Sequence, residues 1–255
     1  DWIADFQRDA LARGIHAATL EQAFAGVQYL PQVVERDRSQ AEFTRTVWDY
    51  LDTAVSPGRI ARGQDRWYEV RPLAEAAATR YGVPATILAA IWGMESNFGS
   101  NTGDIPTIDA LATLGFDGRR AAWAREQLLA ALRILQSGDI ARERMIGSWA
   151  GAMGQTQFLP TNFLAYAVDA DGDGRRDIWG SMADVLASTA HFLARAGWQA
   201  GQSWGLEVRL APDFDVGRAD ADVRQSSMRW AAEGVRSMDG TALPELPDAA
   251  VFLPA

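Results

Sequence analysis

The sequence predicts a mainly α-helical protein with a smaller segment of mixed α and β structure at its end. Apolar residues recur at helical spacing from the start of the chain, as Trp2, Phe6 and Ala10 illustrate. Near residue 205 the pattern changes to the alternation typical of a short strand, in Leu206, Val208 and Leu210. No run approaches the ~20 apolar residues of a membrane-spanning helix, so we expect no such helix in this sequence.

Capping and helix-breaking residues place the elements between these two ends. Ser56-Pro57 is typical of a helix start and Gly63 of a helix end, which predicts a short helix followed by a longer one to Tyr81. Gly82-Val83-Pro84 breaks that helix and starts the next. The remaining periodic segments predict helices at residues 84–95, 106–114, 118–136 and 181–196 and a short strand at 251–253.

The charge balance argues against nucleic acid as a partner. The formal net charge is −9, and Arg supplies every positive side chain because the sequence contains no Lys. Proteins that bind nucleic acid through its phosphates carry the opposite sign of charge. The sequence also contains no Cys, which excludes disulfides, thiolate metal sites and a cysteine nucleophile.

Glu95 is the candidate catalytic residue. It follows Ile91 by four residues, Leu88 by seven and Ile87 by eight, which places its carboxyl on the apolar face of the predicted helix. Apolar surroundings disfavour a charged carboxyl, so the pKa of Glu95 should rise toward the value that a general acid needs. The competing interpretation is a Glu that reaches water at a helix end, which is the commoner situation for this residue type.

The segment from residue 169 to 177 has the pattern of a calcium-binding EF-hand loop. Its loop positions one, three, five and nine are acidic: Asp169, Asp171, Asp173 and Asp177. Gly174 provides the sharp turn at position six, and Arg175 at position seven would contribute its backbone carbonyl. Position twelve is Gly180 in place of the usual Glu, so an acidic turn without a metal is the alternative.

Several motifs in a fixed order resemble the membrane-bound lytic transglycosylase B family. They are the helix end Ile91–Gly99, the run Ile108–Leu114, the pair Arg119-Arg120 and the string Ser148–Pro160. The resemblance is strong over residues 66–200 and loose over residues 1–65. It implies a lysozyme-like helical catalytic core at 66–210 with the EF-hand-like loop at 169–184, an N-terminal helical lobe at 1–65 and a small mixed α/β lobe at 211–255.

The resemblance implies a lytic transglycosylase that cleaves peptidoglycan between N-acetylmuramic acid and N-acetylglucosamine without water and leaves 1,6-anhydromuramic ends. Glu95 would act first as acid and then as base, with no catalytic cofactor. Glycosidases more often use two carboxylates. Asp104 and Asp109 are the nearby candidates, but Asp beside turns and helix starts is more often a cap. A hydrolase of the same bond and a non-catalytic, calcium-stabilised wall-binding module are the alternatives.

The resemblance also implies a substrate cleft. Family positions that line the cleft match Ser148 and Gln157, whose hydroxyl and amide groups suit the polar groups of an amino sugar. Guanidinium groups suit muramic or peptide carboxylates, although one of the two arginines is expected to be merely solvated. The further substrate-binding candidates are Arg119, Arg120, Phe192 and Trp48. Phe192 stands where the family has a Tyr, and the neighbouring His191 is expected to be a packing or surface residue.

For the metal, the resemblance adds Asp184 as a late acidic ligand, so that the expected structural calcium site comprises Asp169, Asp171, Asp173, Arg175, Asp177 and Asp184. A capping role behind Ser181 is the other interpretation of Asp184.

The resemblance implies a periplasmic protein whose partner is the peptidoglycan glycan strand. We expect a monomer, and association with other cell-wall enzymes is left open. The family's closing segment, which contains a Tyr-Asn pair, has no match before Ala255. We therefore expect some substrate contacts of the family to be missing from this sequence.

Overall fold

A computed structural model describes residues 1–39 and 46–253 of the chain and confirms the mainly helical fold. Each helix begins and ends at the following residues: α1 (Trp2–Ala12), α2 (Ala17–Phe24), α3 (Pro31–Arg38), α4 (Val47–Ala54), α5 (Pro57–Tyr81), α6 (Ala85–Ser96), α7 (Thr107–Asp117), α8 (Ala121–Ser137), α9 (Pro160–Tyr166), α10 (Met182–Arg195) and α11 (Ser227–Ala232). The strands are β1 (Ile105–Pro106), β2 (Ile146–Gly147), β3 (Val208–Arg209) and β4 (Arg236–Ser237). Two short 3₁₀ turns lie at Arg142–Arg144 and Val216–Arg218.

The described chain divides into two compact units. The larger comprises residues 1–39 and 52–200, and the smaller comprises residues 46–51 and 201–253. The N-terminal helices thus belong to the same unit as the predicted catalytic core. The division of the chain into three lobes, at residues 65 and 210, stays a prediction.

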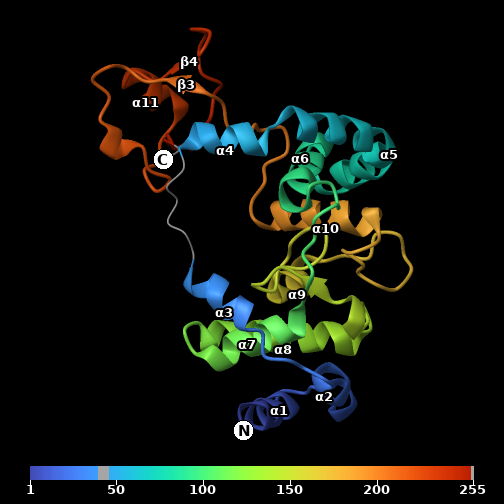
Figure 1. Cartoon of the computed structure of the whole chain (residues 1–255). Helices are drawn as coiled ribbons and strands as arrows, with labels where there is room; N and C mark the ends of the chain where they lie inside the picture. The colour runs from blue at the N-terminus through green and yellow to red at the C-terminus, as the bar shows by residue number, and fades with distance from the viewer. Residues whose placement is uncertain (40–45, 254–255) are drawn as a thin grey trace. The chain divides into compact units, whose positions relative to one another are not determined.

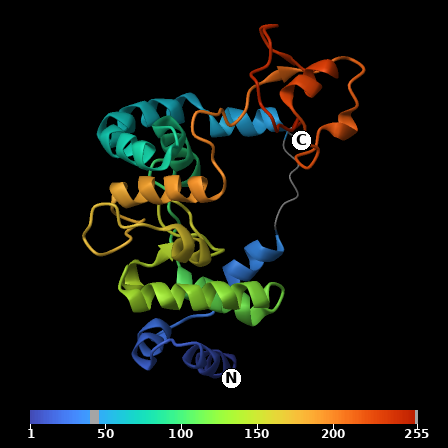
Figure 2. The ribbon, with the colours of Figure 1, turned by 180° about the vertical axis from the view of Figure 1, so that it is seen from behind.

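One layer of the larger unit consists of α5, α6 and α10, which lie side by side in Figures 1 and 2. These helices pack around the buried side chains Val70, Leu88 and Trp92. Gly82 ends α5 in the left-handed conformation, which a residue without a Cβ adopts at little cost. The chain can therefore reverse at once and place α6 against α5.

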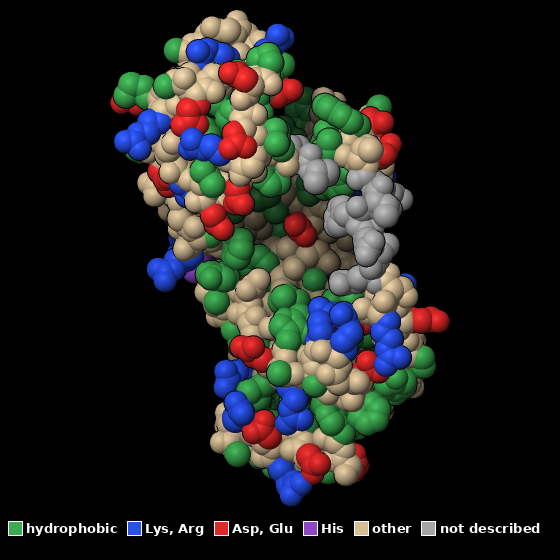
Figure 3. Space-filling view, turned by 90° about the vertical axis from the view of Figure 1, so that its left-hand side faces the viewer, with side chains coloured by type: hydrophobic (Ala, Val, Ile, Leu, Met, Phe, Trp, Pro, Cys, Tyr) green, Lys and Arg blue, Asp and Glu red, His purple; other side chains and the backbone are tan. Residues whose placement is uncertain are grey.

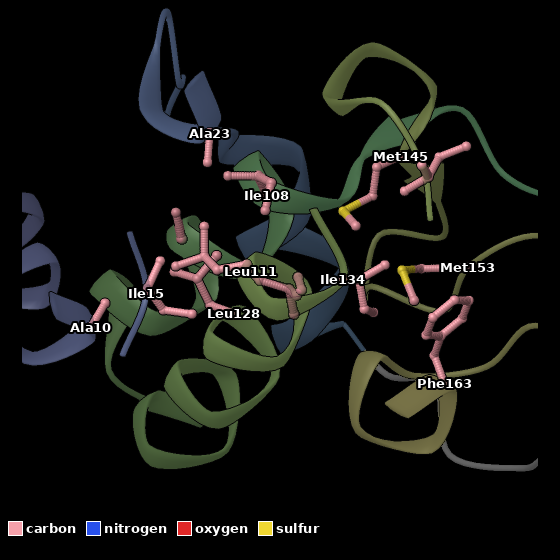
Figure 4. Close-up of a cluster of buried hydrophobic side chains, with 14 of the residues drawn as sticks. Ala10, Ile15, Ala23, Ile108, Leu111, Leu128, Ile134, Met145, Met153 and Phe163 are labelled. Carbon is pink, nitrogen blue, oxygen red and sulfur yellow. The ribbon is translucent and has the colours of Figure 1, made fainter. Parts of the chain in front are cut away.

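A second layer of the larger unit is built on the pair α7 and α8, with α9 and α2 packed against α8. Its apolar core, drawn in Figure 4, joins residues far apart in sequence, such as Ile15, Leu128 and Met153. The antiparallel pair β1 and β2 connects this layer to the segment that follows α6, because Ile105 pairs with Gly147 and Pro106 with Ile146.

Two predictions about the elements are wrong. Helix α5 runs without a break through Gly63, because this glycine provides space for a ring and does not end a helix: a Cβ there would lie 2.7 Å from Phe98 Cζ. Residues 251–253 form no strand. The partner of β3 is β4, and Val251 is instead a buried core residue beside Trp230 and Val235.

The surface drawn in Figure 3 carries acidic and basic side chains interspersed with hydrophobic ones. Among the helices of the described residues, none combines the length and the apolar character that crossing a membrane requires.

Candidate active site

Glu95 lies in the last turn of α6, where the apolar face of that helix meets the surface. Leu88 is fully buried on this face, and Ile87 and Ile91 are half-buried. Glu95 is exposed as a residue, yet the protein atoms around its carboxyl remove enough water to raise its pKa. Within residues 1–39 and 46–253, no hydrogen bond or ion pair to this carboxyl is present. The predicted placement of Glu95 at the rim of an apolar surface is confirmed.

The chain turns sharply directly after Glu95. Asn97 and Phe98 both have left-handed backbones, with φ of 49° and 58°. The Ser96 hydroxyl donates to Trp92 O at 3.2 Å and accepts from Gly99 N at 3.1 Å, which closes the turn. Such backbones are uncommon outside glycine and persist where the surrounding structure enforces them. The sequence motif located this turn but gave no indication of its strain.

The Phe98 ring holds this turn against the two helices beside it. It packs edge-on against the Trp92 ring, with centroids 5.4 Å apart. It also fills the space that Gly63 and Gly93 leave open, since a Cβ on Gly93 would lie 2.5 Å from Phe98 Cζ. Gly63 on α5 and Gly93 on α6 therefore leave room for the ring of Phe98, which follows Glu95 by three residues.

Asp109, one of the two possible second carboxylates, already has structural partners. It is 5% exposed, its Oδ2 pairs with Arg142, and its Oδ1 accepts from Gln28 N at 2.9 Å. A carboxylate bound in this way connects α7 to the N-terminal helices and is not free to activate water. Asp104 is exposed and stays the alternative second acid.

Ser148 and Gln157 are brought to the segment that follows the Glu95 turn. Strand β2 leads into Ser148, and Gly103 passes so close that a Cβ on it would lie 2.6 Å from Ser148 N. Gln157 has a left-handed backbone (φ 51°), and its Nε2 donates to Thr102 O at 3.1 Å. The Ser148 backbone and the Gln157 side chain thus lie beside residues 102–103, seven to eight residues after Glu95.

Arg119 and Arg120 share one buried carboxylate, which the sequence did not indicate. Asp37 on α3 is 2% exposed, lies within 2.8 Å of an Arg120 nitrogen, and accepts two hydrogen bonds from Arg119. The hydrogen bonds from Arg119, followed by the positive charge of Arg120, outweigh burial and lower the pKa of Asp37. The Arg120 guanidinium also lies over the rings of Trp123 and Trp149, at 4.6 and 5.6 Å from their centroids. Neither arginine is merely solvated.

The two aromatic candidates have different surroundings. Phe192 is half-buried and packs against Phe158 and Tyr166, with ring centroids 5.8 and 5.0 Å apart. Trp48 is 70% exposed and belongs to the smaller compact unit. His191 is a packing residue as expected, because its Nδ1 lies 2.9 Å from Tyr166 O.

The acidic loop brings together three of the six predicted metal ligands. Oxygen atoms of Asp169, Asp171 and Asp184 lie within 4.8 Å of one another. The Asp173 carboxylate accepts from Arg175 N at 2.8 Å, and the Asp177 carboxylate accepts from the backbone of residues 179 and 180. Within the described residues the cluster thus comprises the first, second and last of the five predicted acids. Carboxylate oxygens are ligands that Ca²⁺ prefers, so these three residues fit that ion.

Asp184 combines this position with a structural role. Ser181 caps α10 by accepting from Asp184 N, as predicted. The Asp184 carboxylate does not return the bond to Ser181 but accepts from Ala170 N and Asp177 N, each at 2.7 Å. Burial outweighs these two bonds and raises the pKa of Asp184.

The fold and the site define the class of protein first. A helical core that carries one acid at the end of an apolar helix is the lysozyme-like arrangement, and solved structures with this fold match 100% and 98% of the chain. A comparison with known families then matches residues 1–255 to the family described as "Transglycosylase SLT domain". The chain belongs to this family.

Individual relatives are consistent with this assignment. The Escherichia coli (strain K12) "Membrane-bound lytic murein transglycosylase B" is 33% identical over 153 residues, which are 60% of this chain and 42% of that relative. The chain thus matches less than half the length of this curated relative. SltB3 from Pseudomonas aeruginosa in complex with NAG-NAM-pentapeptide is 52% identical, with a TM-score of 0.95 over 100% of this chain and 69% of the other. Escherichia coli Slt35 in complex with calcium is 25% identical, with a TM-score of 0.86 over 98% and 79% of the two chains.

Proposed function

We propose that this protein is a lytic transglycosylase of peptidoglycan. The observation that carries the proposal is Glu95, an acid with a raised pKa and no partner among the described residues, in a chain that belongs to the SLT transglycosylase family. SltB3, which is 52% identical to this chain, has been solved with NAG-NAM-pentapeptide and with NAG-anhNAM-pentapeptide. A ligand of the second kind, with an anhydro sugar, is the expected product of the reaction proposed here.

In the proposed reaction, Glu95 performs two proton transfers. Its protonated carboxyl gives a proton to the glycosidic oxygen as the bond from that oxygen to the anomeric carbon of N-acetylmuramic acid breaks. The 6-hydroxyl of the same sugar then bonds to this carbon, and the Glu95 carboxylate takes its proton. Glu95 ends protonated, the linkage becomes a 1,6-anhydro ring and a free N-acetylglucosamine end, and no water is consumed. A raised pKa suits both steps because the proton is held loosely enough to be given and taken near neutral pH.

The other candidate residues would bind the glycan strand. The Ser148 hydroxyl and the Gln157 side-chain amide suit sugar hydroxyl and acetamido groups. The hydrogen bond from Gln157 Nε2 to Thr102 O, in the segment that follows Glu95, supports this role. Arg119 and Arg120 would bind muramic or peptide carboxylates with donors that Asp37 does not use. Phe192 and Trp48 would contribute apolar contacts to sugar rings.

The metal proposal concerns stability and not chemistry. Asp169, Asp171 and Asp184 would hold a structural calcium ion, with Asp173, Asp177 and the Arg175 carbonyl as further ligands if the loop closes around it. A calcium complex of Slt35 supports the choice of ion. The catalytic steps need no cofactor.

A periplasmic location and a monomer that acts on glycan strands complete the proposal. The membrane-bound curated relative supports a place at the cell wall. Nucleic acid is not a proposed partner, because the net charge of −9 opposes binding to phosphates.

Clearing of a suspension of purified cell-wall sacculi tests the proposal. The wild-type chain should lower the turbidity, and Glu95→Gln, which keeps the shape of the side chain, should not. A wild-type chain that binds sacculi and leaves them intact would instead support the wall-binding module.

A further inference from the structure

We propose that Gln155 is a positioning residue that fixes the end of α6, and with it Glu95, relative to the rest of the site. This proposal deepens the proposed function and depends on it for its kinetic arm. Gln155 belongs to the string after Ser148 but was given no role by the sequence.

The Gln155 amide connects two segments that are far apart in sequence. Its Oε1 accepts from the indole nitrogen of Trp92 at 2.8 Å, and its Nε2 donates to Trp179 O at 2.9 Å. Its own backbone nitrogen donates to Ile178 O at 2.8 Å. The Gln155 backbone is therefore bound to residue 178, and its side-chain amide binds residue 179 through Nε2 and α6 through Oε1.

The two residues that Gln155 approaches on the α6 side lie before and after Glu95 in the sequence. Trp92 precedes Glu95 by three residues and is 2% exposed, so its ring cannot turn away into solvent. Gly99 follows Glu95 by four residues and approaches Gln155 so closely that a Cβ would lie 2.3 Å from Oε1. One amide oxygen thus contacts the chain on both sides of the catalytic residue. A rotation of the last turn of α6 would break the hydrogen bond from Trp92 to Gln155 or press Gly99 against the Gln155 amide.

The anchor on the other side is itself fixed. Trp179 Nε1 donates to Ile146 O at 3.1 Å, and Ile146 lies in β2, two residues before Ser148. Asp177 holds Trp179 N at 3.0 Å. Gln155 therefore relates the position of the candidate acid to the strand that presents the candidate sugar-binding serine.

An amide is the side chain that these contacts require. The indole N–H needs an acceptor and the Trp179 carbonyl needs a donor, and an amide supplies one of each at the same position. A carboxylate could accept from Trp92 but would face the Trp179 carbonyl with two acceptors. A Met of similar length would offer the buried Trp92 indole N–H only a weak acceptor and the Trp179 carbonyl no donor.

The test compares Gln155→Met and Gln155→Glu with Gln136→Met. Gln136 is the matched control, because its amide likewise accepts from an N–H (here the backbone N–H of His16, 2.7 Å) and donates to a carbonyl (Gly14 O, 3.2 Å), but it holds the N-terminal helices. For each variant, kcat and KM are measured on purified peptidoglycan across a range of pH, and Tm is measured separately. The pKa of Glu95 is measured by NMR titration of its carboxyl resonance, which is assigned by its absence from Glu95→Gln.

We expect Gln155→Met to lower kcat about tenfold, since a small displacement of a catalytic group costs one or two orders of magnitude, and to leave KM within about twofold. The alkaline limb of the rate profile and the NMR pKa of Glu95 should move to lower pH as water reaches the carboxyl. Gln155→Glu should lie between Gln155→Met and wild type, and Gln136→Met should change Tm alone.

Gln155 variants that lose Tm as Gln136→Met does, but keep the wild-type kcat and Glu95 pKa, would overturn the positioning role. If the wild-type chain itself cleaves no peptidoglycan, the proposed function fails. The NMR titration still decides the positioning role in that case, because it needs no turnover.

Discussion

Glu95 and Asp184 have pKa values raised by the same cause, burial, but their surroundings differ. The Asp184 carboxylate is fully buried and accepts two backbone hydrogen bonds that fix both of its oxygen atoms. The Glu95 carboxyl reaches the surface and has no partner among the described residues. The contrast teaches that a raised pKa alone does not identify a catalyst. A carboxyl that exchanges a proton with substrate needs free oxygen atoms, and a carboxyl that organises a loop needs them occupied.

The largest effect is expected from Glu95→Gln. Removal of the transferable proton should lower the rate of muropeptide release by about 10²-fold or more, since positioned acid–base groups contribute 10²–10⁴-fold. Circular dichroism should give an unchanged helical spectrum, because no described hydrogen bond is lost. A folded variant with more than a tenth of the wild-type rate would mean that another group is the acid.

Asp184→Asn should have the opposite profile. The amide that replaces one carboxylate oxygen cannot accept from both Ala170 N and Asp177 N, so one buried donor loses its partner at a cost of about 1–3 kcal/mol. Urea unfolding should register this loss, whereas kcat at a temperature where the variant is folded should stay within about twofold. If Asp184→Asn instead lost much of its kcat and kept its stability, Asp184 would have a catalytic role like that proposed for Glu95.

The effect of calcium on stability tests the structural role of the acidic loop that Asp184 binds. Saturation at about a hundred times Kd should stabilise the native state by about 2.7 kcal/mol and raise Tm by about 5–10 °C. Asp171→Ala should abolish most of this gain, and Asp173→Ala, which lies outside the cluster of three, should reduce it less. Calorimetric scans that coincide in calcium and in chelator would reduce the loop to an acidic turn.

The smallest effect concerns the pH dependence of stability. A folded pKa of Glu95 above the unfolded value, about 4.3, means that the folded state binds more protons between the two values, so stability falls as pH rises through this window. Glu95→Gln does not titrate there and should gain Tm relative to wild type at pH 8 but not at pH 4. The gain should be modest because Glu95 is an exposed residue. A Tm difference independent of pH would mean that the pKa is not raised.

Local sequence patterns predicted the parts of the site that depend on neighbouring residues. The apolar face of α6 is encoded within eight residues, and that is why the placement of Glu95 was correct. The Ser181 cap and the turn after Glu95 are local in the same sense.

Contacts across the chain could not be predicted in this way. Gly63 has the residue type of a helix end, and only the Phe98 ring, 35 positions later, explains why α5 continues through it. Asp37 lies 82 residues before Arg119, and no local rule pairs them. The same holds for Gln155, whose indole partner lies 63 residues away. Tertiary packing decides these positions.

The source of the oxygen at the new sugar end tests the central claim most directly. If Glu95 performs both proton transfers, the intramolecular 6-hydroxyl, with an effective molarity of about 10⁵ M or more, should outcompete water at roughly 55 M. Digestion of purified peptidoglycan in ¹⁸O-labelled water should then give unlabelled anhydromuramic ends, one water lighter than reducing ends. Predominant labelled reducing ends would contradict the account, because a positioned water would be the nucleophile and Asp104 would have to be reconsidered as its base.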